Sequence, residues 1–302
     1  MTRVTPTTLS SGVMAGLQSS LSRLQQTQEQ LSSGRRLNRP SDSPVDTVAA
    51  MQLRAQQGQQ EQLSRNIDDG LAWLNTADSA LNQTSSSLNR VRQLLLAGSN
   101  ATNGPAEREA MAAEVDQLRA GILQLANSQY GGRPVFAGTQ DTAAAYDPAT
   151  GAYLGNGATV DRTVSDDAAS GRVPVSVPGS AAFTTLLADP SDPTGAGVLA
   201  RVSAALRSGD TTSLGSALGD LDTAGEALRS TQSTVGARTN RLTAAQSSGA
   251  LRADTVTSRL AAVEDIDLAK TITDLSLQQT AYQAALGAAA KVVQPSLMDF
   301  LR

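Results

Sequence analysis

Apolar residues recur at alternating spacings of three and four along most of the chain, a pattern typical of α-helices that pack as coiled coils. It predicts a long helix over residues 44–97, a shorter one over 105–130, and a second long helix from Leu214 toward Asp265. The two long stripes keep a strict seven-residue repeat, at Ile67, Leu74, Leu81, Leu88 and Leu95 and at Leu214, Leu221, Leu228, Val235 and Leu242.

The residues that delimit these stretches agree with helix starts and stops. Gly34 follows the first apolar stripe and Gly98 follows the first long one, and glycine commonly ends a helix. Ser43 and Pro44 are predicted as the N-cap and first residue of the long helix, with Asp46 as the acidic half of a capping box. Both long helices therefore have local signals for where they begin or end.

Each end of the chain carries one narrow apolar stripe, and the last helix is predicted to stop at Pro295. Such helices are marginal alone, because most helical stability comes from packing. Covering one Leu contributes about 1.5–3 kcal/mol. A pair formed by the two ends leaves much of each stripe in water, so we predict an assembly interface that docks against other copies. Its residues are Met14, Leu17, Leu21, Leu24, Gln28 and Leu31, and Ile272, Leu275, Gln279, Tyr282, Leu286, Ala289 and Val293.

Two alternatives stay open for these stripes. Gln28 and Gln279 interrupt them either as tolerated polar residues or as buried amides that set the register of the helices. The heptads are also compatible with a four-helix bundle that covers every stripe within one chain. A head-to-tail contact that does not close would instead generate a helical filament.

Between residues 131 and 197 the helical periodicity disappears, and short β-branched runs alternate with Gly, Pro and Asp turn signals. This predicts a β-rich insert, followed by a short helix over 198–207. The fold class is mainly α with a β-rich insert (α+β), in which long antiparallel helices form a rod and coiled-coil helices form the termini. The predicted segments are 1–40 and 265–302 for assembly, 41–130 and 198–264 for the rod, and 131–197 for an outward-facing insert.

An elongated rod follows from the length of the first long helix. If residues 44–97 are continuous, the helix is about 80 Å long at 1.5 Å per residue. A compact chain of 302 residues has a diameter of only about 50 Å. A break at Gly58 or Gly70 would weaken this argument without removing the heptads.

Composition removes several functional classes. The chain has no Cys and no His, which excludes thiol nucleophiles, imidazole bases and the usual zinc ligands, and we expect no cofactor and no enzymatic activity. Its 24 Lys+Arg against 28 Asp+Glu make duplex nucleic acid a poor partner. No apolar run reaches the roughly 18–20 residues of a membrane span. The N-terminus also lacks the apolar core of a cleaved secretory signal.

Two charged clusters remain as candidates for chemistry. Three of the four positions from Glu264 to Asp267 are carboxylates, which allows a metal or acid–base site but favours solvated charges at the start of the last helix. Arg35, Arg36 and Arg39 allow phosphate binding, although cations after the end of a helix are ordinary. Neither cluster forms a catalytic constellation.

Residues 31–44, Leu-Ser-Ser-Gly-Arg-Arg-Leu-Asn-Arg-Pro-Ser-Asp-Ser-Pro, resemble the N-terminal signature turn of bacterial flagellins and their relatives. The Pro-Ser-Asp-x-Pro-Val form at 40–45, the Phe-Ala-Gly motif at 136–138 and the Met-Asp-Phe-Leu ending at 298–301 are more similar to the hook–filament junction branch of that family. Ser43 stands where the flagellin pattern has a second Asp, and it caps a helix about as well. The signature positions are Ser33, Gly34, Arg36, Leu37, Asn38, Pro40, Asp42 and Pro44.

The resemblance covers about residues 1–140 and 215–302. It implies a structural adaptor of the bacterial flagellum, needed for filament attachment and swimming, that forms a ring with copies of itself between hook-associated protein 1 and flagellin. It also implies an extracellular subunit exported through the flagellar type III apparatus without a cleaved signal. An export chaperone is then expected on the last helix, at Leu275, Tyr282, Leu286 and Val293.

Two other functions are weighed against the junction adaptor. One is a filament flagellin, the bulk subunit of the propeller. The other is a secreted enzyme on a flagellin scaffold with its activity in the insert, which the absence of His and of convergent polar residues disfavours.

Overall fold

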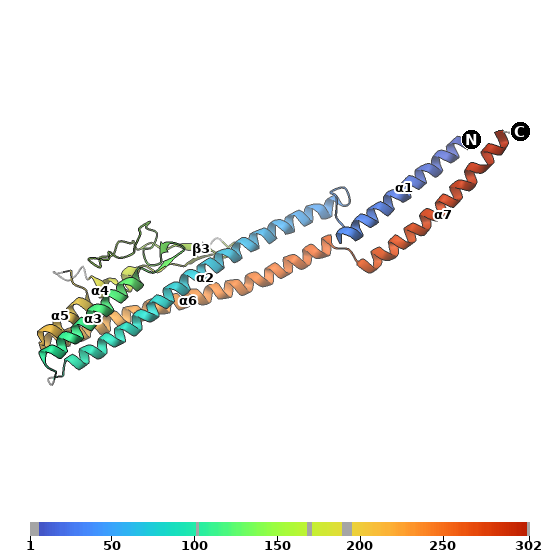
Figure 1. Cartoon of the computed structure of the whole chain (residues 1–302). Helices are drawn as coiled ribbons and strands as arrows, with labels where there is room; N and C mark the ends of the chain where they lie inside the picture. Colours follow the sequence, from blue (N-terminus) through green and yellow to red (C-terminus); the bar gives the residue numbers. More distant parts are fainter. Residues whose placement is uncertain (1–5, 101–102, 168–170, 189–194, 301–302) are drawn as a thin grey trace. The chain divides into compact units, whose positions relative to one another are not determined.

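The computed structural model describes residues 6–100, 103–167, 171–188 and 195–300, and within these ranges the side chains other than those of 6–10, 211 and 291–300. The chain forms two compact units. Unit 1 comprises Met1–Gln59 and Arg252–Arg302, and unit 2 comprises Gln60–Leu251. Unit 1 is therefore built from two segments that are distant in the sequence, whereas unit 2 is one continuous segment (Figure 1).

Helices dominate the described residues, and the mainly α class with a small β-containing insert is confirmed. Helix α2 is continuous over 55 residues, so neither Gly58 nor Gly70 breaks it. The helices are α1 (Pro6–Ser33), α2 (Pro44–Gly98), α3 (Pro105–Ala126), α4 (Thr184–Leu187), α5 (Val198–Ser208), α6 (Thr211–Glu264) and α7 (Leu268–Phe300). The strands are β1 (Gln129–Tyr130), β2 (Arg133–Pro134), β3 (Asp161–Thr163) and β4 (Arg172–Pro174).

Most predicted helix ends are confirmed. Helix α1 ends before Gly34, whose φ of +70° lies in the left-handed region that glycine tolerates. Helix α2 begins at Pro44, and the Ser43 Oγ accepts a hydrogen bond from the Asp46 N–H at 3.4 Å. The Asp46 carboxylate takes a partner that the capping box does not predict, because it accepts a hydrogen bond from the Arg36 guanidinium at 2.8 Å.

Two predicted ends are wrong. Helix α3 stops at Ala126 instead of near residue 130, because the Asn127 side chain exchanges two hydrogen bonds with the backbone of Tyr146 and turns the chain into the insert. Helix α7 continues past Pro295 to Phe300. A proline inside a helix removes one backbone hydrogen bond, which weakens the helix there but does not require it to end.

In unit 2, the helices α2, α3, α5 and α6 cover one another's apolar stripes, and all ten heptad residues of the two long stripes are at most 6% exposed. Ion pairs on the outside join each helix to its neighbours, which shows the order α2–α3–α5–α6 around the core. The pairs are Arg90–Glu114, Arg207 with Glu109 and Asp116, Arg201–Asp220, and Arg92–Asp222, the last of which returns from α6 to α2.

The insert is held by an aromatic core more than by its strands. β1 pairs with β2 and β3 with β4, each as a short antiparallel ladder, so most of the predicted β-branched runs lie in loops. The Phe136 and Phe183 rings meet edge to face with centroids 4.9 Å apart, and Tyr146 packs against Tyr153 at 5.1 Å. Close packing of large rings compensates for the small amount of regular hydrogen bonding.

The insert packs directly on the long helices at Gly70 of α2. A Cβ atom there would lie 2.9 Å from the Val175 side chain and 3.0 Å from that of Leu242 of α6. Next to this contact, the Asn66 side chain donates a hydrogen bond to the Thr163 carbonyl at 2.9 Å. Gly70 is therefore required for the close approach of the insert to α2.

We predict that Gly70→Leu lowers the free energy of unfolding of unit 2 by about 1–3 kcal/mol, since the new side chain overpacks this contact. The unfolding midpoint in urea, followed by the fluorescence of Trp73, measures this effect, because Trp73 is the chain's only tryptophan and is buried in unit 2. Gly236→Leu is the matched control, because nothing lies within 4 Å of a Cβ on that exposed α6 glycine. Equal midpoints for the two variants would contradict the prediction.

Candidate assembly interface

The signature turn between α1 and α2 is organised by the carboxylate of Asp42. Its Oδ2 accepts hydrogen bonds from the backbone N–H of Asn38 at 3.1 Å and of Arg39 at 2.8 Å. Its Oδ1 accepts one from the Gln26 side chain at 3.4 Å, and its own N–H donates to the Arg39 carbonyl. The Asp of the signature thus satisfies backbone donors that the tight turn would otherwise leave without partners.

The turn is bonded to the linker between α6 and α7, which lies far away in the sequence. The Arg36 N–H donates to the Glu264 carbonyl at 2.6 Å, and the Ile266 N–H donates to the Gly34 carbonyl at 3.2 Å. The Arg36 guanidinium donates in addition to the Val263 carbonyl at 2.8 Å. These bonds hold the end of α1 beside the start of α7.

The prediction for Glu264 is wrong. We expected a solvated charge, but Glu264 is only 4% exposed and its carboxylate lies 2.7 Å from Arg54 Nη2 and 3.9 Å from Arg35 Nη1. Arg35 lies in the turn and Arg54 in α2. No local sequence pattern predicts that either residue pairs with Glu264. Asp267 meets the expectation for the start of α7, since its Oδ1 accepts a hydrogen bond from the Lys270 N–H.

Phosphate binding by the arginine cluster finds no support in the geometry. Arg36 pairs with Asp46 at 2.8 Å, and Arg39 pairs with Glu29 at 3.0 Å. The hydrogen bond from Arg36 lowers the pKa of the Asp46 carboxyl, which keeps it charged and paired. Arginines that already hold carboxylates are structural parts of the turn.

The remaining signature positions shape the turn. The Ser33 Oγ accepts a hydrogen bond from the Arg35 N–H at 3.1 Å, directly after the end of α1. Leu37 and Asn38 are half-buried, whereas Pro40 is exposed just before the α2 N-cap. The predicted signature residues are thus brought together in one turn.

Helices α1 and α7 lie side by side and antiparallel in unit 1 (Figure 1). Thr27 is 7% exposed and its hydroxyl donates to the Gln278 Oε1 at 2.9 Å. Thr271 is also buried in this contact region of α7, at 9% exposed. A polar contact therefore lies inside the terminal helix pair.

Each predicted terminal stripe divides into two rows. The inner row is half-buried and comprises Leu17, Leu24 and Leu31 of α1 and Leu275, Tyr282 and Ala289 of α7. The outer row is exposed and comprises Met14 (58%), Leu21 (39%) and Gln28 of α1 and Ile272 (48%), Gln279 and Leu286 (45%) of α7. The Val293 side chain lies outside the described residues.

Gln28 and Gln279 both lie in the exposed outer row, so neither is a buried amide within one chain. Thr27 and Gln278, one position earlier in each helix, make the buried polar contact instead. The four-helix-bundle alternative holds for the central stripes of unit 2 and fails for the terminal ones. Large apolar side chains of α1 and α7 stay in water within the chain.

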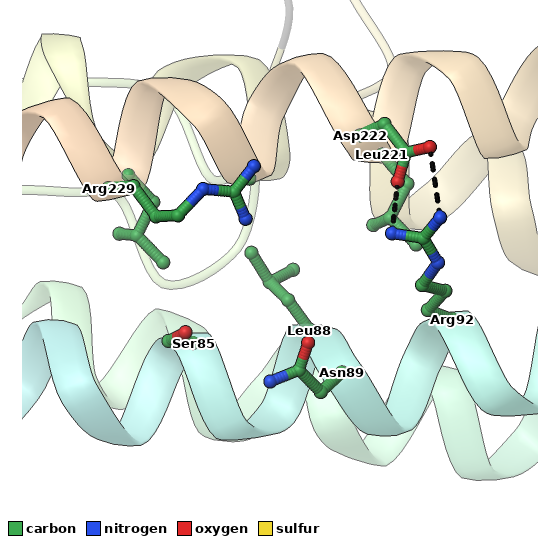
Figure 2. Close-up of a pocket in the computed structure, with 9 residues that line it drawn as sticks. Ser85, Leu88, Asn89, Arg92, Leu221, Asp222 and Arg229 are labelled. Carbon is green, nitrogen blue, oxygen red and sulfur yellow. Dashed lines mark hydrogen bonds and ion pairs between the residues drawn. The ribbon is translucent and has the colours of Figure 1, made fainter.

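The described residues offer no convincing ligand site in the core. A small gap between α2 and α6, lined by Ser85, Leu88 and the Arg92–Asp222 pair, has a volume of about 30 Å³ (Figure 2). This space can hold water but no larger ligand. Among the described residues, no three acidic side chains converge as a metal site would require, and no helix combines the length and apolarity of a membrane span.

Comparison with known proteins agrees with this arrangement. The model of the bacterial flagellin N-terminal helical region matches residues 6–141, and that of the C-terminal helical region matches residues 218–301. The chain belongs to the flagellin family. It is therefore a structural component of the bacterial flagellum.

Within the family, the chain is 26% identical to flagellar hook-associated protein 3 of Escherichia coli over 90% of this chain and 91% of that protein. A flagellin of Clostridium tyrobutyricum is 39% identical but over only 33% of this chain and 26% of its own length. The flagellar junction protein FlgL of Legionella pneumophila shares the fold, with a TM-score of 0.56 at 16% identity over 72% of this chain and 99% of that one. The predicted resemblance to the flagellin family, and to its hook–filament junction branch, is confirmed.

We predict that Glu264→Ala loosens the link between the turn and the α6–α7 linker, because Arg54 and Arg35 lose their buried partner. Amide exchange at Arg36 and Ile266 should become at least several-fold faster. Glu29→Ala is the matched control, since its pair with Arg39 is exposed and such pairs contribute about 0–1 kcal/mol. Unchanged exchange in Glu264→Ala would show that the backbone bonds alone hold the linker.

Proposed function

We propose that this chain is the adaptor subunit that joins the flagellar hook to the flagellin filament. The observation that carries the proposal is the exposed outer row on α1 and α7, in a chain whose other long stripes are covered. The comparison favours the junction over the filament, since the hook-associated relative matches along 90% of the chain and the flagellin relative along 33%. Hook-associated protein 1 would adjoin it on one side and flagellin on the other.

The free energy of apolar burial explains why the terminal helices would assemble with other copies. Covering a large apolar side chain contributes about 1.5–3 kcal/mol, and the outer row offers four in the described residues. Within one chain these residues contribute little, because α1 and α7 cover only each other's inner rows. Residues 1–40 and 265–302 would therefore form the inner layer of a ring of identical copies, residues 41–130 and 198–264 its rod, and residues 131–197 its outward face.

Charged substitutions in the outer row test this role. We expect Leu21→Asp combined with Leu286→Asp to abolish filament attachment and swimming when it replaces the natural chain in cells. Both side chains are exposed, at 39% and 45%, so the free subunit should fold with little change in its unfolding midpoint. Filament counts by electron microscopy and swimming in soft agar measure the effect.

Leu251→Asp is the control for this experiment, because Leu251 is 70% exposed and lies outside the terminal stripes. Normal filaments on cells with the double variant would refute the assembly role of the outer row. The purified natural chain at high concentration separates the two flagellar functions. Short oligomers or none fit the adaptor, whereas long filaments would identify a propeller subunit.

Before assembly, the subunit would pass through the flagellar type III apparatus without a cleaved signal, accompanied by an export chaperone on α7. Leu286 of the expected chaperone site is exposed, whereas Leu275 and Tyr282 are half-buried against α1. Val293 lies in α7, but its side chain is outside the described residues. A chaperone that binds the inner row would have to replace α1, and so would keep the two ends of the chain apart.

We expect Leu275→Asp combined with Leu286→Asp to reduce chaperone binding by at least tenfold in calorimetric titration, because the charges are placed in the apolar face that docks. Leu277→Asp is the matched control on the same helix, since Leu277 is 68% exposed and lies outside the expected site. Binding of the double variant as tight as that of the control would overturn the chaperone assignment.

A further inference from the structure

A second exposed surface in unit 1 lies beside the signature turn. An open groove of about 500 Å³ runs between the turn and the first turns of α2. The residues that line it include Leu37 and Met51, the arginines Arg35, Arg39 and Arg54, and the buried Glu264, which pairs with Arg35 and Arg54. Three arginines and one carboxylate give the lining a net positive charge beside its apolar residues.

Apolar side chains extend from this groove along one side of α2. Val45 is 80% exposed, Val48 is 56% exposed and Met51 is 64% exposed, at successive spacings of three residues. Residues three apart are neighbours on a helix surface. Single exposed apolar residues are normal, but a contiguous group marks an interaction surface.

The charge of unit 1 is divided unevenly between its two segments. Residues 1–59 contain six arginines and three carboxylates, a net charge of +3, whereas residues 252–302 contain five basic and six acidic residues, a net charge of −1. Contact between the first segments of two copies is repulsive, and contact between a first and a second segment is attractive. The groove belongs to the positive segment.

The start of α7 has the complementary surface. Leu277 is 68% exposed, and Asp274 and Asp267, three and ten residues before it, lie on the same side of the helix, with Asp267 exposed and Asp274 half-buried. The bond from the Ile266 N–H to the Gly34 carbonyl keeps the start of α7 level with the turn that lines the groove. Copies placed side by side at one height therefore bring the groove of one copy near the start of α7 of the next.

We propose that this groove receives residues 267–277 of α7 from a second copy of the chain. The inference rests on the proposed function, since it requires copies that assemble side by side, and it identifies a contact between them. Leu277 packs against Met51 and Val48, while the two aspartates face the arginines of the groove. The two surfaces differ, so the contact is heterologous and builds a ring or a helix instead of a closed pair. It leaves the outer row free for other neighbours.

Cross-linking tests the contact, because the natural chain has no cysteine. Two differently tagged chains, one with Met51→Cys and one with Leu277→Cys, are produced together in cells that lack the natural chain. A short bis-maleimide is then added to the isolated hook–filament structures. We expect a cross-linked dimer that carries both tags, which no link within one chain can produce. Met51→Cys with Leu154→Cys is the control, since Leu154 is exposed on the insert.

A charge in the groove gives an independent measurement. We expect Val48→Asp to lower the number of incorporated copies by about tenfold, the effect of losing one interface anchor, with an unchanged unfolding midpoint of the free chain. Absence of the doubly tagged dimer, a link from Met51→Cys to another protein instead, or normal incorporation of Val48→Asp would each overturn the inference. Loss of filaments in the outer-row variant combined with any of these results would leave the proposed function standing.

Discussion

An amphipathic helix is stable in water when other helices bury its apolar stripe. The number of helices packed together in each unit decides how much of that stripe is buried. In unit 2, four helices surround one core, and stripe residues such as Leu74 and Leu228 are at most 1% exposed. Among the described residues of unit 1, α1 packs along α7 and each helix covers one flank of the other. The opposite flank stays in water. Apolar residues at heptad spacing thus form a buried core in unit 2 and a partly exposed apolar surface in unit 1.

The polar contacts of unit 1 lie where the chain changes from one helix to the next. Asp42 satisfies the backbone of the signature turn, and Glu264 joins the turn to α2 through Arg35 and Arg54. A buried carboxylate is costly unless its charge is paired, so this arrangement tolerates few alternative geometries. This pairing fixes where the first turns of α2 and α7 are presented, and the groove beside the signature turn lies at that point.

Much of the site was accessible to reasoning from the sequence, but its division into two rows was not. The three-four spacing identified Leu17 and Leu21 as members of one stripe, because period alone locates the apolar face. Whether a position faces α7 or water depends on the rotation of each helix about its own axis. In the structure, this rotation places Thr27 and Gln278 between the two helices and Gln28 on the exposed side. Local pattern also misplaced the end of α3, where Asn127 binds the distant backbone of Tyr146.

The sequence by itself determined the helices, the β-containing insert and the family, because apolar period, glycine and proline positions and the signature motif are all local properties of the chain. Only the tertiary structure decided the partners of Glu264, the close approach at Gly70 and the choice between covered and exposed faces. These depend on residues separated by scores of positions, such as Arg54 and Glu264. Periodicity locates the apolar stripe of a helix. Only the packed structure shows which residues of that stripe are buried within the chain and which stay exposed.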